Sequence, residues 1–217
     1  LGRLKNAEAL NDLERLVLND PVTKVREAAA FALGFIPGGY TTLLRASEAE
    51  INLKAPTVTA RIYDALGHQG NSEAVPLLME ALSEKAPADR AAAVALGRIG
   101  MDNRDAVNQR QILEDLVHAL DIRHYDRRRA AAFALARIRP SQWSEDIEAQ
   151  VIKLAEFDYD PLIRSRLIRA LSETIEGQTA VPILQSAMAD DHIAVRVAAA
   201  RSLKKLPPDR ALAMGTT

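Results

Sequence analysis

Alanines and large apolar residues recur along the chain in one arrangement, a short apolar run that leads to an anchoring leucine. Six runs show this arrangement, and successive anchors are 30 to 39 residues apart. Self-similarity at a period of 20 to 50 residues indicates a repeat architecture, in which each repeat is one supersecondary unit. The sequence therefore predicts an array of six units. Their anchors are Leu33, Leu66, Leu96, Leu135, Leu171 and Leu203.

A second apolar segment precedes each anchor by 15 to 25 residues. Its large apolar residues fall at positions i, i+3, i+4 and i+7, which is the spacing of one helical face. An aspartate stands before a proline at Asp20 and again at Asp160, a pairing that suits a helix cap followed by the first helical residue. Each unit is therefore predicted to be a helix pair, and no sheet is required. The six segments are residues 9–18, 40–46, 73–82, 110–120, 147–157 and 179–188.

One family shares this pattern. Residues 20–36 fit the form D-P-x-x-x-V-R-x-A-A-x-x-A-L-G-x-I, and residues 74–78 and 180–184 read AVPLL and AVPIL. The chain resembles HEAT repeats, and most closely the short subclass named after phycobilisome lyases. The resemblance implies an all-α fold, a right-handed α-α superhelix of about six helix pairs. Tetratricopeptide and ankyrin repeats fit less well, because their characteristic residues are missing.

The resemblance also sets the expected organisation. One solenoid domain is expected over residues 1–206, followed by a tail or linker at 207–217. The opening Leu1-Gly2-Arg3-Leu4 has the form of Leu96-Gly97-Arg98-Ile99, so the chain is expected to be a piece of a longer protein. The repeats are expected at about 5–37, 38–70, 71–101, 102–140, 141–176 and 177–206.

Seven positions before the anchor, four of the six units carry arginine. In three of the units a turn aspartate stands six residues earlier. In HEAT-type repeats such an arginine commonly joins the turn aspartate of its own or the adjacent unit, so these residues are interpreted as a structural ladder. Replacing Arg128 with alanine should then cost on the order of 1 to 3 kcal/mol. The ladder residues are Asp20, Arg26, Arg128, Asp158, Arg164, Asp190 and Arg196.

Positions −6, −2 and +2 from the anchor lie opposite the core face, at about 100° per residue. In solenoids of this type the second helices line the inner surface. The last four units place seven cations and one acid, Glu173, at these positions, whereas the first unit places two phenylalanines there. Arg127 lies eight positions before its anchor, at neither the ladder position nor one of these three groove positions, and its role stays open. The predicted partner-binding groove comprises Phe31, Phe35, Arg90, Arg98, Arg129, Phe133, Arg137, Arg169, Arg201 and Lys205.

The distribution of charge along the chain indicates what kind of partner the predicted groove binds. The chain has a formal net charge of −1, so it is not a basic protein overall. Its cations gather at groove positions while acids spread over the first helices, which favours an acidic partner in the groove. The alternative is that these arginines are solvated or paired with nearby acids, and that the phenylalanines pack between units.

Catalytic and metal-binding motifs are missing. The chain has no cysteine, which excludes disulfides and thiolate ligands. Absence of cysteine fits both the cytosol and the periplasm, and the cytosol is the favoured expectation. None of its four histidines precedes a glutamate, so the His-Glu pairs that bind iron in HEAT-like deoxyhypusine hydroxylases are lacking. Phosphate loops and nucleophile elbows are also absent. No apolar run approaches the length of a membrane span. We therefore predict no enzyme activity, no metal and no cofactor.

These features predict a non-catalytic protein-protein interaction scaffold or adaptor. Its partner is expected to be another protein that offers an acidic, or mixed acidic and apolar, segment to the groove. Two alternatives remain open: a nucleic-acid-binding protein similar to the HEAT-like alkylpurine glycosylases, and a subunit of a bilin lyase-type modifying system.

Overall fold

The computed structural model is all-α over the part of the chain that it describes, with thirteen α-helices and no strand there. The chain divides into two compact units, Leu1–Asn108 and Gln109–Thr217. The described residues are 9–102, 106–121, 124–138, 143–172 and 177–205.

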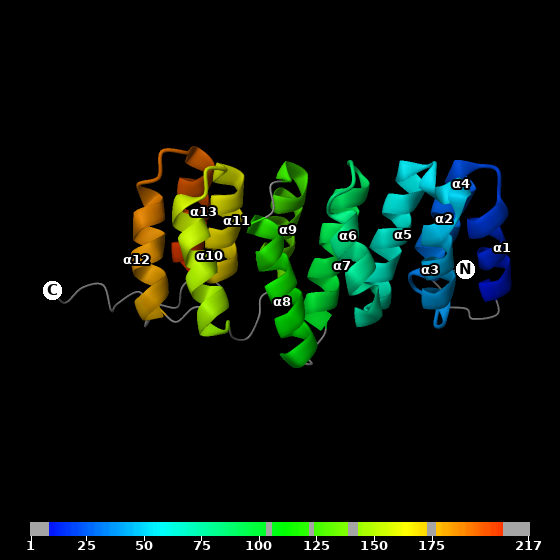
Figure 1. The fold of residues 1–217 in the computed structure, drawn as a ribbon, viewed down its shortest axis with the longest axis horizontal. Coiled ribbons are helices and arrows are strands. Elements are labelled where there is room, and N and C mark those ends of the chain that lie inside the picture. Colours follow the sequence, from blue (N-terminus) through cyan, green and yellow to red (C-terminus); the bar gives the residue numbers. More distant parts are fainter. Residues whose placement is uncertain (1–8, 103–105, 122–123, 139–142, 173–176, 206–217) are drawn as a thin grey trace. The chain divides into compact units, whose positions relative to one another are not determined.

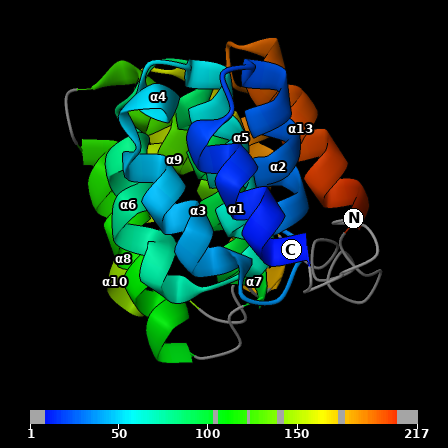
Figure 2. The ribbon, with the colours of Figure 1, turned by 90° about the vertical axis from the view of Figure 1, so that its right-hand side faces the viewer.

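Unit 1 is built from three helix pairs. Its second helices, α2, α5 and α7, pack one against the next (Figure 1), and the first helices α1 and α3 lie side by side (Figure 2). A short helix, α4, stands between α3 and α5. The helices are α1 (Leu10–Asn19), α2 (Thr23–Leu33), α3 (Gly39–Glu48), α4 (Glu50–Leu53), α5 (Pro56–Gln69), α6 (Val75–Ala81) and α7 (Ala88–Asp102), with one 3₁₀ turn at Ser72–Ala74.

Unit 2 repeats this plan. Its second helices, α9, α11 and α13, form a row of neighbours, and the first helices α10 and α12 are in contact. Proline at the start of α11 follows the capping Asp160, whose carboxylate accepts a hydrogen bond from the Leu162 amide at 2.9 Å. The helices are α8 (Ala106–Asp121), α9 (Tyr125–Ile138), α10 (Glu145–Phe157), α11 (Pro161–Ser172), α12 (Gly177–Met188) and α13 (Ile193–Lys205).

Small residues let the second helices approach closely. A Cβ atom added at Gly67 in α5 would lie 2.6 Å from the Cα of Ala95 in α7, so only glycine fits this crossing. The helix then ends at Gly70, whose φ of +70° is readily adopted by glycine. Both glycines thus have a backbone reason for their positions.

The core follows the predicted apolar stripe. The anchors Leu33, Leu66, Leu96 and Leu135 are fully buried, and Leu171 is nearly so. Burial of such side chains is the main favourable term in folding, at about 25 cal/mol per Å² of apolar area. The single tryptophan, Trp143, is also buried, in unit 2.

The prediction of an all-α fold of helix pairs is confirmed. Helix α4 was not predicted, because four residues are too few to show a helical period. The proposed repeat boundaries stay predictions. The expected tail at 207–217, the opening Leu1-Gly2-Arg3-Leu4 and Glu173 lie outside the described residues.

Candidate functional site

In unit 2, arginines of the ladder column connect successive helix pairs. Arg164 donates from Nη1 to the carbonyl of Asp158 at 2.6 Å, and from Nε and Nη2 to the carboxylate of Asp190 at 2.9 and 2.8 Å. Arg128 forms a buried ion pair with the Asp158 carboxylate. Arg196 donates to the carbonyl of Asp190 at 2.7 Å. Arg128 and Arg164 each bind the turn aspartate of the following pair, so their charge is used within the fold.

In unit 1 an asparagine takes the place of that aspartate. Arg26 donates to the carbonyl of Asp20 at 2.7 Å and to Oδ1 of Asn52, in α4, at 2.9 Å. The Asp20 carboxylate instead accepts from the Val22 amide at 2.8 Å. Asn52 is fully buried and donates to the carbonyls of two earlier helices, α1 and α3. No sequence signal identified Asn52, because a lone asparagine outside any periodic segment carries none.

Arg129 was predicted to face the groove, but its guanidinium forms hydrogen bonds with Asp160 of the next helix pair. It donates to both oxygens of Asp160 at 2.6 and 3.2 Å, and its Cζ lies 4.1 Å from the ring centroid of Tyr125. The hydrogen bond with Asp160 raises the pKa of Arg129. Arg129 therefore acts as a second tie between α9 and the start of α11.

These carboxylates predict a pH dependence. Burial opposes ionisation of Asp160, but the hydrogen bonds from Arg129 and from the Leu162 amide outweigh it and lower the pKa. Hydrogen bonding to Arg164 likewise lowers the pKa of Asp190. A lowered folded-state pKa contributes stability that is present above the unfolded value, about 4, and is lost as the pH falls through the folded value. We expect unit 2, followed by Trp143 fluorescence, to lose stability below about pH 4.

The matched variant for this test is Asp160→Asn, which keeps an acceptor and removes the titrating group. It should be less stable than the parent chain at pH 7, and the difference should shrink as the pH falls from 4 to 2. Parallel pH profiles for the two proteins would contradict the assignment.

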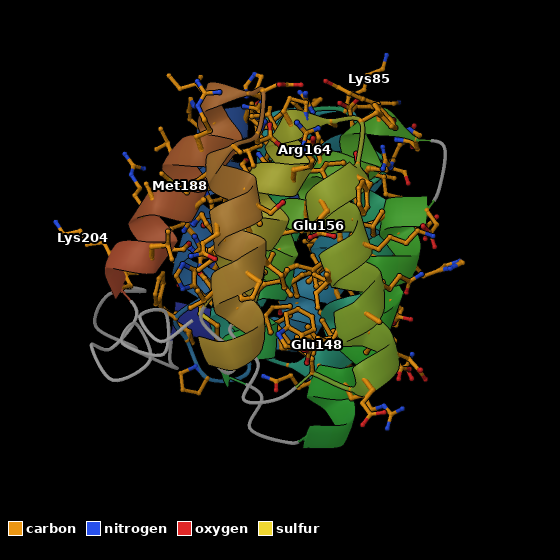
Figure 3. The ribbon with its side chains drawn as sticks, turned by 90° about the vertical axis from the view of Figure 1, so that its left-hand side faces the viewer. Lys85, Glu148, Glu156, Arg164, Met188 and Lys204 are labelled. Atoms are coloured by element: carbon orange, nitrogen blue, oxygen red, sulfur yellow. The ribbon has the colours of Figure 1, made fainter. Side chains whose placement is uncertain are left out.

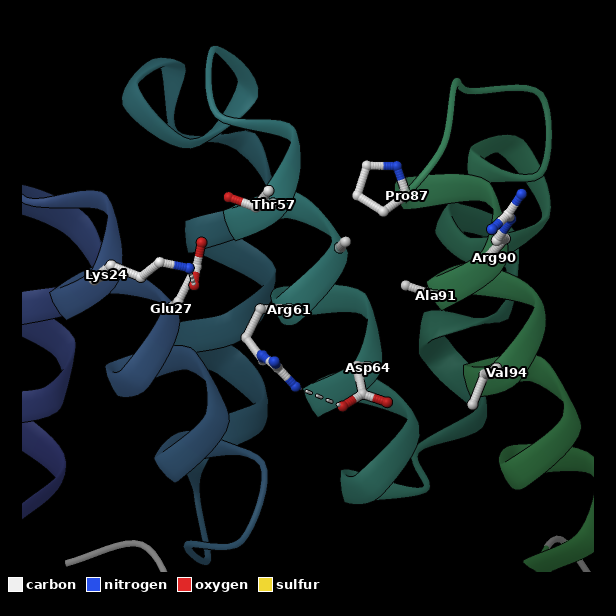
Figure 4. A pocket seen from close by; sticks show the side chains of 10 residues that line it. Lys24, Glu27, Thr57, Arg61, Asp64, Pro87, Arg90, Ala91 and Val94 are labelled. Atoms are coloured by element: carbon white, nitrogen blue, oxygen red, sulfur yellow. Dashed lines mark hydrogen bonds and ion pairs between the residues drawn. The ribbon is translucent and has the colours of Figure 1, made fainter.

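Unit 1 contains a cavity of 470 Å³ beside α2, α5 and α7, shown in Figure 4. Its charges are mixed: Lys24 pairs with Glu27 at 2.7 Å and Arg61 with Asp64 at 3.4 Å. Arg90 lines this cavity and is exposed. The cavity thus carries cations beside acids that largely neutralise them.

The other predicted residues of unit 1 do not line that cavity. Arg98 donates from Nη1 to the Asp64 carboxylate at 2.5 Å. The rings of Phe31 and Phe35 have centroids 5.1 Å apart, and Phe35 lies 4.4 Å from the ring of His68. Burial and the charge of Arg98 lower the pKa of His68. Phe31 on α2, Phe35 in the turn after α2 and His68 on α5 thus form one cluster of rings.

Unit 2 contains a larger groove, of 930 Å³, along α9, α11 and α13. It brings together five residues that the sequence assigned to the partner-binding surface: Phe133, Arg137, Arg169, Arg201 and Lys205. It adds two cations that the column analysis missed, Arg166 and Lys204. No acid occurs among the described residues that line it, and the remaining lining residues are Ala136, Ser165, Ser172, Ala194, Val197, Ala198 and Ser202.

Several of these cations are uncommitted. Among the described residues, none forms an ion pair or hydrogen bond with the side chain of Arg169, Arg201 or Lys204. Figure 3 shows Lys204 at the C-terminal end of α13, away from Glu148 and Glu156 on α10. Because no acid occurs among the described residues that line the groove, these three charges act on whatever enters it.

An aromatic ring organises the α9 side of the groove. The Cζ atoms of Arg137 and Arg166 lie 5.8 and 5.2 Å from the ring centroid of Phe133, within the range of cation–π attraction. Arg166 also donates to the carbonyl of Arg129 at 2.5 Å. The Nε of Arg137 is buried and has no hydrogen-bond partner within the described part of the chain. Phe133 thus holds two guanidinium groups beside the groove.

Among the described residues, no group of three or more metal-ligating side chains comes together. No described helix has the length and apolarity needed to cross a membrane. The basic groove of unit 2 is the candidate functional site.

Stacked helix pairs with a row of second helices define the chain as an α-solenoid repeat protein. Residues 48–136 and 148–214, more than half of the chain, match the family of HEAT repeats, and the chain belongs to that family. No curated protein matches the sequence.

Solved structures agree with this assignment. The complex of CpcE and CpcF of phycocyanin lyase from Nostoc sp. PCC7120 is similar over 76% of this chain and 99% of that one, with 21% identity and a TM-score of 0.56. A designed armadillo repeat protein in complex with the peptide (KR)4 is similar over 89% of this chain and 98% of that one, with 19% identity and a TM-score of 0.50. At such identities the likeness concerns the fold alone.

Proposed function

We propose that this HEAT-repeat protein is a non-catalytic binding scaffold that holds an acidic segment of another protein in the groove of unit 2. The observation that carries the proposal is the lining of that groove. Six cationic side chains meet there, with no acid among the described lining residues. The cavity of unit 1 lacks this excess of positive charge, because it carries Glu27 and Asp64 beside its cations.

Electrostatics supports an acidic occupant. Like charges gathered in one concavity repel one another, and that repulsion is relieved when an anion binds. Arginine is well suited to the role, because its guanidinium can hold a carboxylate through two parallel hydrogen bonds. Ala136, Ala194 and Val197 line the groove and give the occupant an apolar surface on which to bury methylene groups.

Nucleic acid is the less favoured occupant. Proteins that bind single strands stack bases on exposed aromatic rings. Phe133, the one aromatic ring among the described residues that line this groove, already lies against two guanidinium groups. The third candidate, a subunit of a bilin lyase-type system, is suggested by the likeness to the CpcE and CpcF complex, which concerns the fold alone. A change in bilin absorbance on mixing with the chain would favour this third candidate.

The proposal is tested with fluorescein-labelled poly-L-glutamate and labelled single- and double-stranded DNA. We expect the full chain to bind poly-L-glutamate, and the double variant Arg169→Glu/Arg201→Glu to bind it at least tenfold more weakly. The matched control is Arg110→Glu/Lys153→Glu, which makes the same charge change on α8 and α10 of the same unit, away from the groove residues.

Three results would contradict the proposal. Equal loss in both double variants would show that net charge, and not the groove, governs binding. Absence of poly-L-glutamate binding at 50 mM salt would remove its basis. Tight DNA binding that falls steeply with salt, without glutamate binding, would indicate a nucleic-acid scaffold.

A further inference from the structure

The cations of the unit 2 groove stand on three successive helices. Arg137 is on α9, Arg169 on α11 and Arg201 on α13, and each of these helices contacts the next. Packed helices have axes about 8 to 10 Å apart. The three guanidinium groups therefore begin from backbone positions spread across the row in steps of about 10 Å, along a path of about 20 Å.

An extended chain matches this step. In the polyproline II conformation a peptide advances about 3.1 Å per residue with three residues per turn, so residues i and i+3 lie on the same face about 9 Å apart. A helix advances only 1.5 Å per residue and would need about seven residues for a step of about 10 Å. Acidic residues three apart in a peptide extended in this way would thus meet one arginine on each helix.

The groove offers partners for a peptide backbone as well. Small residues such as Ala136, Ala194 and Ala198 line the groove and leave room for a main chain. The hydroxyls of Ser165 and Ser172 donate to carbonyls of their own helix at 2.9 and 3.0 Å. Each oxygen keeps lone pairs that can accept a hydrogen bond from a peptide N–H.

One donor in the groove lacks a partner. The Nε atom of Arg137 is buried without a hydrogen bond to the described part of the chain. A buried donor without an acceptor costs free energy, and an incoming carboxylate would remove that cost. This observation is independent of the helix spacing and points to an anion at the α9 end of the groove.

We propose that the unit 2 groove binds an extended peptide with acidic side chains at positions i, i+3 and i+6, which meet Arg137, Arg169 and Arg201 in turn. This inference rests on the proposed function and names the partner segment for it. The occupant is a protein segment with a fixed spacing of carboxylates, and general negative charge alone does not satisfy the groove.

The test compares labelled peptides of equal length, composition and charge. Each carries three glutamates in a Gly/Ser/Ala background, spaced by one, two, three or four positions. Binding to the full chain is measured by fluorescence anisotropy at 50 mM salt, where exposed charges are weakly screened. We expect the three-position spacing to bind at least fivefold more tightly than the others.

Pairwise contacts are tested with the variant Arg201→Gln. Arg201 is exposed, so we expect the change to leave the fold intact. Replacing one terminal glutamate of the preferred peptide with glutamine should weaken binding to the parent chain and have little further effect on Arg201→Gln. Lys153→Gln on α10 is the control and should leave the preference intact. Full additivity of the peptide and protein changes would overturn the contact with Arg201.

The outcomes distinguish failure of the proposed function from failure of the proposed spacing of acidic residues. If all spacings bind equally and poly-L-glutamate also binds, the proposed function stands and the spacing is wrong. A preference for the four-position spacing, which places acids on one face of a helix, would indicate a helical occupant and overturn the extended one. If no acidic peptide or poly-L-glutamate binds, both proposals fail.

Discussion

Replacing Arg128 with leucine is expected to lower the free energy of unfolding of unit 2 by about 3 to 5 kcal/mol. Arg128 and Asp158 form an ion pair with side chains that are 8% and 1% exposed. Removal of the guanidinium leaves a buried carboxylate without its counter-charge, and also leaves the carbonyl of Leu120 without the Arg128 donor. The loss can be measured by urea unfolding followed through Trp143, the only tryptophan in the chain.

Arg196→Leu is the matched control for this experiment. Arg196 also lies seven positions before its anchor, but within the described residues its side chain donates only to the backbone carbonyls of Asp190 and Asp191. Its loss should therefore cost about 1 kcal/mol. The double variant Arg128→Leu/Asp158→Asn should be more stable than the sum of the single changes implies, because neither charge is then buried alone. A loss below about 1 kcal/mol for Arg128→Leu would contradict a buried pair.

Replacing Asn52 with leucine is expected to destabilise unit 1 by about 2 to 4 kcal/mol. Asn52 is fully buried and joins three elements: its Oδ1 accepts from Arg26, and its Nδ2 donates to the carbonyls of Val17 and Ala46. Leucine has a similar size but satisfies none of these groups. The buried guanidinium of Arg26 then loses its side-chain acceptor.

Two measurements follow the Asn52→Leu variant. Circular dichroism at 222 nm should show a lower urea midpoint, and hydrogen exchange should rise most in peptides that cover α1 to α4. Asn19→Leu is the control, because Asn19 is exposed and the structure shows no side-chain partner for it within the described residues. Equal effects of the two changes would mean that the Asn52 bonds contribute nothing specific.

The helix pairs and the core could be predicted because both depend on short-range periodicity. Each anchor leucine ends an apolar stripe that is visible within one helix, and the anchors up to Leu171 are buried as the stripe requires. Helix α4 could not be predicted, since its role comes from one asparagine that contacts residues 6, 26 and 35 positions away. Such contacts leave no local pattern.

The groove was predicted in part for the same reason. Position within a repeat fixes which face of a helix a side chain occupies, and Arg137, Arg169 and Arg201, which were assigned to the same face as Phe133, line one groove with it. It could not distinguish a cation that lines the groove from one that is tied to another helix pair. Arg129 lies in a groove column but bonds with Asp160, 31 residues later.

The sequence by itself determined the class of this protein, an all-α array of HEAT repeats, because apolar periodicity and small residues dictate paired helices that pack closely. Only the tertiary structure decided which charges remain available. An arginine is neutralised when a neighbouring helix pair brings a carboxylate within hydrogen-bond distance, as Asp158, Asp160 and Asp190 do. At Arg169, Arg201 and Lys204 none of the described residues brings such an acid, and these are the charges that we propose a partner binds.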